Sequence, residues 1–131
     1  MNGSCAEYPP EELLRGIGEF NAGEWFGCHE TMEELWAGEQ REVKYLYQGI
    51  LQVAVALHHW REGNFRGALF LFGSAERLLG RVEPACQGVD TAALAADAGR
   101  LREALERLGE ERMETLDPAF IPRIRFVPET S

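Results

Sequence analysis

The chain is short of basic residues and of long apolar runs, and both shortages exclude classes of protein. It holds 13 Lys and Arg against 22 Asp and Glu, which gives a formal net charge of -9 over 131 residues. Nucleic-acid phosphates are bound by basic stripes, so we expect no nucleic-acid partner. The most apolar run, from Tyr45 to Leu57, is interrupted by Gln48 and Gln52 and is too short and polar to span a bilayer. We therefore expect no membrane anchor.

Cysteine is scarce as well, with only Cys5, Cys28 and Cys86. The number is odd, and the spacings fit neither a zinc finger nor a disulfide framework. A reducing, cytoplasmic setting is therefore expected, with Cys28 and Cys86 as small core residues. The first residues, MNGSCAEYPPEE, contain no basic or apolar region typical of a signal or transit peptide. The length suits a single domain over residues 1–131.

Apolar residues never alternate with polar ones at a period of two, so we expect no sustained strand. Glycine, proline and capping residues divide the chain into helix-length pieces, which predicts an all-α bundle of about five helices. The first expected helix begins near Pro10 and ends near Asn21. The other four cover Glu24 to Trp36, Arg41 to Arg61, Phe65 to Leu79, and Thr91 to Leu108. Asn64 and Asp90 or Thr91 are the expected starts of the last two. The proline-rich tail is expected to be extended and draped over the bundle.

One stretch of the sequence is echoed 40 positions later. GEWFGC, from Gly23 to Cys28, and GNFRGA, from Gly63 to Ala68, both read Gly-x-aromatic-x-Gly-small. This predicts two related helical hairpins packed side by side, and a repeat-type interaction scaffold is the alternative interpretation. The counterpart of His29 in the second copy is Leu69, so the histidine belongs to the first copy alone.

CHETMEELW, from Cys28 to Trp36, is the stretch most suggestive of a site. His29 and Glu33 are one helical turn apart and are expected on the inward face, whereas Glu30 projects to the polar side. A histidine and a carboxylate in this arrangement can hydrogen-bond each other or share a metal ion. The spacing resembles the zinc-protease motif HExxH, but Glu33 replaces the second histidine. One helix supplies two ligands at most, so further ligands must come from elsewhere.

The third expected helix supplies candidates for those ligands. Gln48, Gln52 and His59 fall on one face with Tyr45, and this face is predicted to meet His29 and Glu33 across a cleft. His58 lies about 100° away on the wheel and is a weaker candidate. The enzyme hypothesis is a divalent Zn, Mn or Fe ion held by His29, Glu33 and His59. It would activate water for hydrolysis of an unidentified small molecule, with Glu30 or Gln52 assisting.

The competing hypothesis needs no metal and no catalysis. The histidine and glutamate then form a structural hydrogen bond that fixes helix packing. The protein would act by binding a partner, or by forming a homodimer, through an exposed apolar patch.

The residues of the first two-thirds of the chain resemble a known family. The similarity rests on an aromatic-Asn pair, Gly-x-aromatic, His-Glu-x-x-Glu-x-x-Trp, Gln-Gly-x-x-Gln, a histidine, and Gly-Asn-x-x-Gly-Ala. Here these are Phe20, Asn21, Gly23, Trp25, His29, Glu30, Glu33, Trp36, Gln48, Gly49, Gln52, His59, Gly63, Asn64, Gly67 and Ala68. The chain is thus similar, over about residues 12–80, to the bacterial and archaeal helical family catalogued as domain of unknown function 309. The resemblance implies an all-α bundle of small cytoplasmic proteins that often self-associate. Members carry the label of predicted metal-dependent hydrolases, with no established activity.

Overall fold

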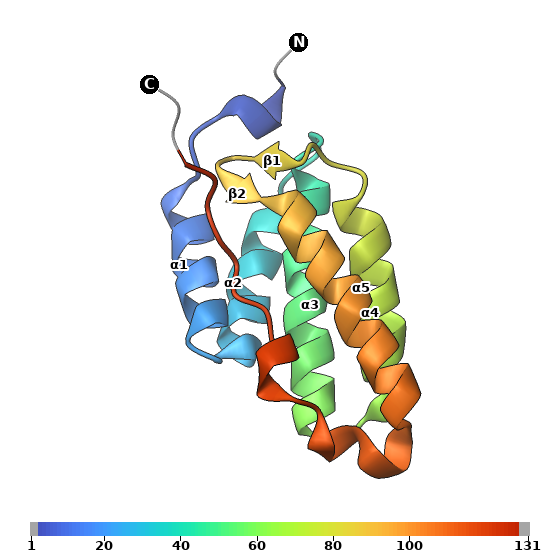
Figure 1. The fold of residues 1–131 in the computed structure, drawn as a ribbon. Helices are drawn as coiled ribbons and strands as arrows, with labels where there is room; N and C mark the ends of the chain where they lie inside the picture. The colour runs from blue at the N-terminus through green and yellow to red at the C-terminus, as the bar shows by residue number, and fades with distance from the viewer. Residues whose placement is uncertain (1–2, 129–131) are drawn as a thin grey trace.

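The computed structural model describes residues 3–128, in which helices predominate (Figure 1). The α-helices are α1 (Glu11–Asn21), α2 (Trp25–Ala37), α3 (Lys44–Arg61), α4 (Phe65–Leu79) and α5 (Thr91–Leu108). The other elements are the 3-10 turns η1 (Ser4–Ala6), η2 (Glu110–Thr115) and η3 (Pro118–Phe120), and an antiparallel hairpin of β1 (Ala85–Cys86) and β2 (Val89–Asp90). The predicted all-α bundle is confirmed. Within residues 3–128, no helix has both the length and the apolar character that crossing a membrane requires.

Each α-helix packs against the next one along the chain, so sequence neighbours are spatial neighbours. In Figure 1, α1 and α2 lie on one side of α3, and α4 and α5 lie on the other. The C-terminal segment crosses in front of the bundle. The central position of α3 explains why the sequence of this helix is apolar over most of its circumference.

The starts of α4 and α5 are fixed by side-chain caps as the sequence predicts. The Asn64 side chain accepts a hydrogen bond from the Gly67 backbone N–H at 3.0 Å, at the start of α4. Asp90 accepts one from the Ala93 N–H at 3.1 Å, at the start of α5. Each cap satisfies a backbone donor that the first helical turn leaves without a partner.

The echoed stretches form two matching helical corners. Gly23 has φ 79° and Gly63 has φ 80°, a conformation that glycine adopts without steric cost. The residues that follow, Glu24 and Asn64, have φ of -90° and -89° and precede α2 and α4. The Arg61 guanidinium donates a hydrogen bond to the Gly23 carbonyl oxygen at 2.7 Å, which places the two corners side by side. The echo therefore corresponds to two hairpins, α1–α2 and α3–α4, within a compact bundle.

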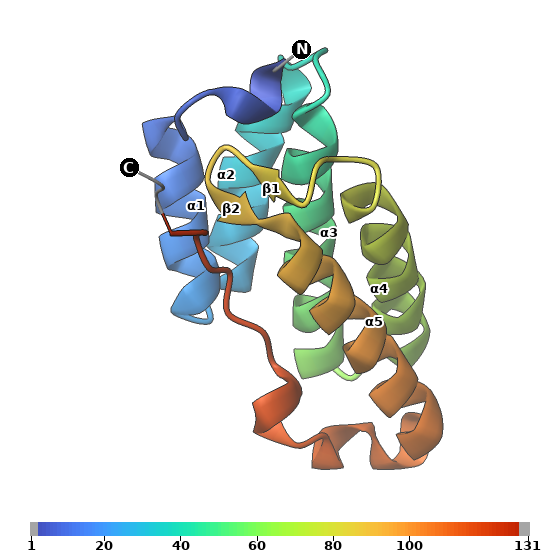
Figure 2. The same cartoon turned by 45° about the horizontal axis from the view of Figure 1, so that its top comes forward.

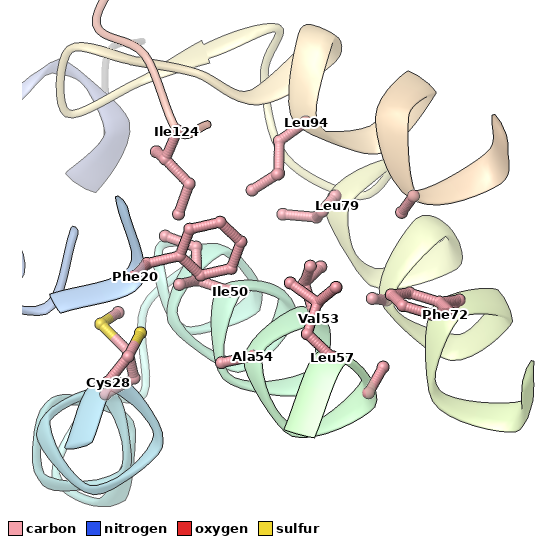
Figure 3. Close-up of a cluster of buried hydrophobic side chains, with 14 of the residues drawn as sticks. Phe20, Cys28, Ile50, Val53, Ala54, Leu57, Phe72, Leu79, Leu94 and Ile124 are labelled. Carbon is pink, nitrogen blue, oxygen red and sulfur yellow. The ribbon is translucent and has the colours of Figure 1, made fainter. Parts of the chain in front are cut away.

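The core lies where these hairpins meet α5 and the C-terminal segment. Figure 3 shows side chains from separate elements converging on α3. The labelled residues are Phe20, Cys28, Ile50, Val53, Ala54, Leu57, Phe72, Leu79, Leu94 and Ile124, all of them buried. Segments distant in sequence thus share one core, as close packing of a single domain requires.

The tail is draped over the bundle as predicted, although it also contains η2 and η3, which the sequence analysis did not anticipate. Ile124 is held through both its backbone groups, because the Asn21 amide donates to its carbonyl at 3.0 Å and accepts from its N–H at 2.8 Å. Farther on, the Val127 N–H donates to the Gly88 carbonyl at 2.8 Å. These bonds attach the tail to α1 and to the β-hairpin.

The expectation of three unpaired cysteines is wrong for Cys5 and Cys86. These two residues form a disulfide across 81 positions of sequence. It joins η1 to β1, two elements that only the tertiary fold brings together, which is why cysteine spacing did not reveal it. Cys28 is free and buried, as predicted.

Candidate functional site

The candidate site begins at the corner that precedes α2. From this corner, α2 directs Trp25, Cys28, Thr31 and Met32 into the interior. His29 lies at the edge of this buried stripe, with 27% of its side chain exposed. Because α2 is held between α1 and α3, the stripe is centred on Cys28 and Met32, and the next residue along is turned partly towards solvent.

Glu33 is not on the inward face, so that part of the prediction is wrong. Its side chain is 59% exposed, and its carboxylate lies 3.7 Å from the His29 Nε2 atom. The distance exceeds that of a hydrogen bond and describes a loose, solvent-facing pair. Glu30 is exposed, as the wheel predicted. The two glutamates of the motif therefore both face water.

His59 turns towards the second corner and away from the predicted cluster. Its Nδ1 atom lies 3.2 Å from the Asn64 side-chain nitrogen, and its backbone carbonyl accepts a hydrogen bond from the Asn64 N–H at 2.8 Å. His59 is four residues from Gly63 and adjacent to the cap of α4, so its nearest polar partner is the capping residue. The predicted cluster of His29, Glu33, Gln52 and His59 is not assembled.

Gln52 is partly buried in α3, and its Oε1 atom has no hydrogen-bond partner among residues 3–128. The Nε1 atom of Trp25, in α2, is also buried without one. Buried polar atoms usually find partners, so these two are exceptions within the described chain. The proposed assisting role of Gln52 in catalysis stays a prediction.

His58, the histidine judged weaker from the sequence, is the one that approaches α2. The Phe26 ring lies between the two histidines, with its centroid 5.8 Å from that of His29 and 5.9 Å from that of His58. These side chains surround a hollow of about 100 Å³ together with Trp25 and Val55. The sequence did indicate that His58 lies on the same face of α3 as Val55, because Leu51, Val55 and His58 are spaced at i, i+4 and i+7 and such positions share one face of a helix.

We call this surface the Phe26 face and define it by Trp25, Phe26, His29, Val55 and His58. The Phe26 side chain is 58% exposed. Its ring is therefore available to a partner, while the residues beside it form the floor and walls of the hollow.

The residues predicted to bind a metal do not fit one in this arrangement. Among residues 3–128, one group of three candidate ligands has its donor atoms within 4.8 Å of one another, and it consists of Cys5, Glu42 and Glu83. His29, Glu33 and His59 form no such group. The assignment of these three as metal ligands stays a prediction.

Cys28 is not a nucleophile despite its position next to His29. Burial, and secondly the nearby Glu19 carboxylate, raises the pKa of its thiol to about 12. A thiol with this pKa is protonated at neutral pH and cannot supply the reactive thiolate. Its role is to fill the core between α2 and α3.

Part of the chain is similar to known proteins. The model of the family described as "Domain of unknown function (DUF309)" matches residues 13–71. The chain is 33% identical over 104 residues to the uncharacterized protein YpuF of Bacillus subtilis (strain 168), a match that covers 78% of this chain and 57% of YpuF. It is 39% identical over 46 residues to an uncharacterized protein of Aquifex aeolicus (strain VF5), covering 34% of this chain and 14% of that protein.

The chain thus spans little more than half the length of YpuF and a small part of the Aquifex protein. No solved structure matches the chain. The family match extends from α1 to the middle of α4 and includes both helical corners and the whole Phe26 face. Over residues 13–71, the chain is thus similar to the DUF309 family.

Proposed function

We propose that the chain is a non-catalytic helical protein that associates with a second copy of itself through the Phe26 face. The observation that carries the proposal is an exposed aromatic ring beside a hollow on the same surface. Phe26 is 58% exposed, and the adjoining hollow of about 100 Å³ is walled by Trp25, Val55 and two histidines. Large aromatic residues in such positions are the usual anchors of protein interfaces.

A ring and a hollow on one patch suit a two-fold symmetric dimer. In such a dimer, the same patch of each copy faces that of the other, so a group that projects from the patch must fit a recess on the same patch of the partner copy. The hollow is of the order of the ~150 Å³ cavities that hold a benzene ring in protein interiors. Phe26 of each copy can therefore insert beside Trp25 and Val55 of the other.

The charge distribution also supports pairing at this face. The whole chain carries a formal charge of -9, which opposes self-association at long range. The Phe26 face itself contains no carboxylate, because its five residues are aromatic, aliphatic or histidine. Added salt screens the long-range repulsion and leaves the apolar contact intact, so dimerisation should strengthen as ionic strength rises.

Metal-dependent hydrolysis is the alternative proposal. The proximity of His29 and Glu33, with 3.7 Å between Nε2 and Oε2, is the observation in its favour. Elemental analysis of the purified protein distinguishes the two proposals. Stoichiometric metal that disappears on His29→Ala would support the hydrolase, whereas the dimer does not depend on metal.

The decisive test of the dimer is the molar mass of Phe26→Glu measured by light scattering during gel filtration. We expect wild type to form dimers at micromolar concentrations and the variant to remain monomeric. The dimer dissociation constant should rise about 30-fold or more, because removing an interface anchor costs about 2 kcal/mol or more.

Phe70→Glu is the matched control, since Phe70 is 69% exposed on α4 and is not part of the Phe26 face. It should dimerise like wild type. A monomeric wild type at high salt, or equal losses in both variants, would refute the proposal. Circular dichroism confirms that both variants are folded.

A further inference from the structure

Three segments of the chain converge at the end of the bundle opposite the helical corners. They are η1, the connection between α2 and α3, and the connection between α4 and β1 (Figures 1 and 2). Cys5 comes from the first, Glu42 from the second and Glu83 from the third, and Cys86 follows in β1. This cluster is separate from the Phe26 face and shares no residue with it.

The donor atoms of this cluster are close enough to serve one cation. The Cys5 sulfur and one carboxylate oxygen from each of Glu42 and Glu83 lie within 4.8 Å of one another. The Cys86 sulfur is bonded to that of Cys5. Donors with bonds of about 2.0–2.3 Å around a tetrahedral Zn²⁺ lie roughly 3.5 Å apart, so the Cys5 sulfur and the two carboxylates are near the spacing that a shared ion requires. Cys86 can join them only after its bond to Cys5 is broken and its side chain turns.

The two carboxylates are exposed, and neither has a basic partner in the described part of the chain. Neither Glu42 nor Glu83 forms an ion pair within residues 3–128. Arg41, the residue next to Glu42, is already paired with Glu7 and Glu39. A bound divalent cation would offset the repulsion between the carboxylates.

Hydrogen bonds position both cysteines independently of the disulfide. The Gln87 N–H donates to the Cys5 carbonyl at 2.7 Å, and the Gln87 amide donates to the Ser4 carbonyl at 3.2 Å. The Ser4 hydroxyl accepts from the Val43 N–H at 3.0 Å, and the Tyr47 hydroxyl donates to the Gln87 Oε1 at 2.8 Å. Because η1, α3 and β1 are held by these bonds, the two sulfurs should stay near the carboxylates after the S–S bond is broken.

We propose that Cys5, Cys86, Glu42 and Glu83 form a redox-controlled site for a divalent cation of the Zn²⁺ class. The disulfide is a poor ligand, whereas two thiolates with two carboxylates make a four-coordinate zinc site. A dithiol reductant supplies two electrons and two protons, which break the S–S bond and give two thiols, and is itself oxidised to a cyclic disulfide. Zn²⁺ then displaces both thiol protons and binds the two sulfurs.

The test uses the full chain in its oxidised and reduced forms, with Zn²⁺ as the probe. The dithiol is removed by anaerobic gel filtration, and Zn²⁺ is titrated in competition with a chromophoric chelator. Thiol counting after denaturation verifies each form, since Cys28 alone is free when Cys5 and Cys86 are bonded. We expect one tightly bound Zn²⁺ in the reduced protein and none in the oxidised protein. Co²⁺ in place of Zn²⁺ should give the thiolate charge-transfer band in the near ultraviolet.

The double variant Glu42→Gln, Glu83→Gln tests the carboxylates without touching the buried sulfurs. It should lower the Zn²⁺ affinity of the reduced protein about tenfold or more. Glu110→Gln, Glu111→Gln, at two exposed carboxylates outside both candidate metal sites, is the matched control and should bind like wild type. Equal Zn²⁺ binding by both redox forms, no effect of the double variant, or loss of helical circular dichroism on reduction would each overturn the proposal.

Discussion

Each of the two helical hairpins has the same kind of corner between its helices, but the two hairpins differ in which side chains they bury. Gly23 and Gly63 turn the chain with nearly the same φ, yet α3 lies between α2 and α4, whereas α1 packs mainly against α2. The second hairpin therefore buries most of α3, and the first keeps Phe26 and His29 at the surface. The comparison teaches that a repeated corner fixes local geometry, while position in the bundle decides which copy keeps its aromatic and histidine side chains at the surface.

The largest expected effect comes from removing the disulfide that connects the segment before the first hairpin to the segment after the second. Cys5→Ala should lower the free energy of unfolding in oxidising, metal-free buffer by about 4 kcal/mol, because a link across 81 positions restricts the unfolded chain strongly. Urea denaturation measures this loss. Reductant should destabilise wild type and leave the variant unchanged, and equal responses would contradict the role of the disulfide.

The next prediction compares a close contact between the two helices of each hairpin, made in both cases at a glycine. A Cβ atom on Gly49 would lie 2.6 Å from Leu79 Cδ2 and 2.7 Å from its Cγ, so Gly49→Ala forces a buried branched side chain to move. We expect a net loss of about 1–2 kcal/mol in unfolding free energy, after the gain in helix propensity.

In the first hairpin, a Cβ atom on Gly16 would meet the Met32 sulfur at 2.7 Å. An unbranched thioether adapts more easily, so Gly16→Ala should stay within about 0.5 kcal/mol of wild type. Thermal and urea unfolding of the two variants side by side measure the difference. Equal destabilisation would show that both contacts are equally rigid.

A smaller effect distinguishes the two corners themselves. Asn64→Ala removes the side-chain cap on the Gly67 N–H and should destabilise the protein by about 1 kcal/mol. Glu24→Ala, at the matching position, should have almost no effect, because the Glu24 side chain makes no capping hydrogen bond. Urea midpoints decide the matter, and a loss of similar size at Glu24 would mean that the first corner is capped in solution too.

The smallest effect concerns the connection between the hairpins. Hydrogen bonds from Arg41 lower the pKa of Glu39 to about 2. The carboxylate therefore stays ionised at lower pH in the folded protein than in the unfolded chain. The stabilisation is present above the unfolded pKa near 4.5 and is lost as pH falls towards 2.

Arg41 is half exposed, so solvent screens the pair and its contribution to stability should be small. Glu39→Gln should therefore reduce the unfolding free energy slightly at pH 7, and this difference should shrink as pH falls through about 2. Unfolding curves across this pH range, with Glu62→Gln as an exposed control, measure it. A constant difference between wild type and Glu39→Gln would contradict the assigned cause.

The helices, their caps and the paired corners could be predicted because they depend on local chemistry. Glycine permits the positive φ of the corners, and Asn64 and Asp90 bond to backbone groups three residues ahead. The candidate site was predicted only in part. His29 does line the Phe26 face, but the helical wheel favoured His59 over His58, and that choice depends on how far α3 is rotated relative to α2.

The sequence by itself determined that this chain forms a helical bundle, because glycine, proline, capping residues and apolar spacing act within one helical turn of where they stand. The tertiary structure alone decided the disulfide between Cys5 and Cys86, the exposure of Glu33 and the meeting of Phe26 with two histidines. Those features join or expose residues through helix rotation and loop closure, which are set by the packing of the whole core.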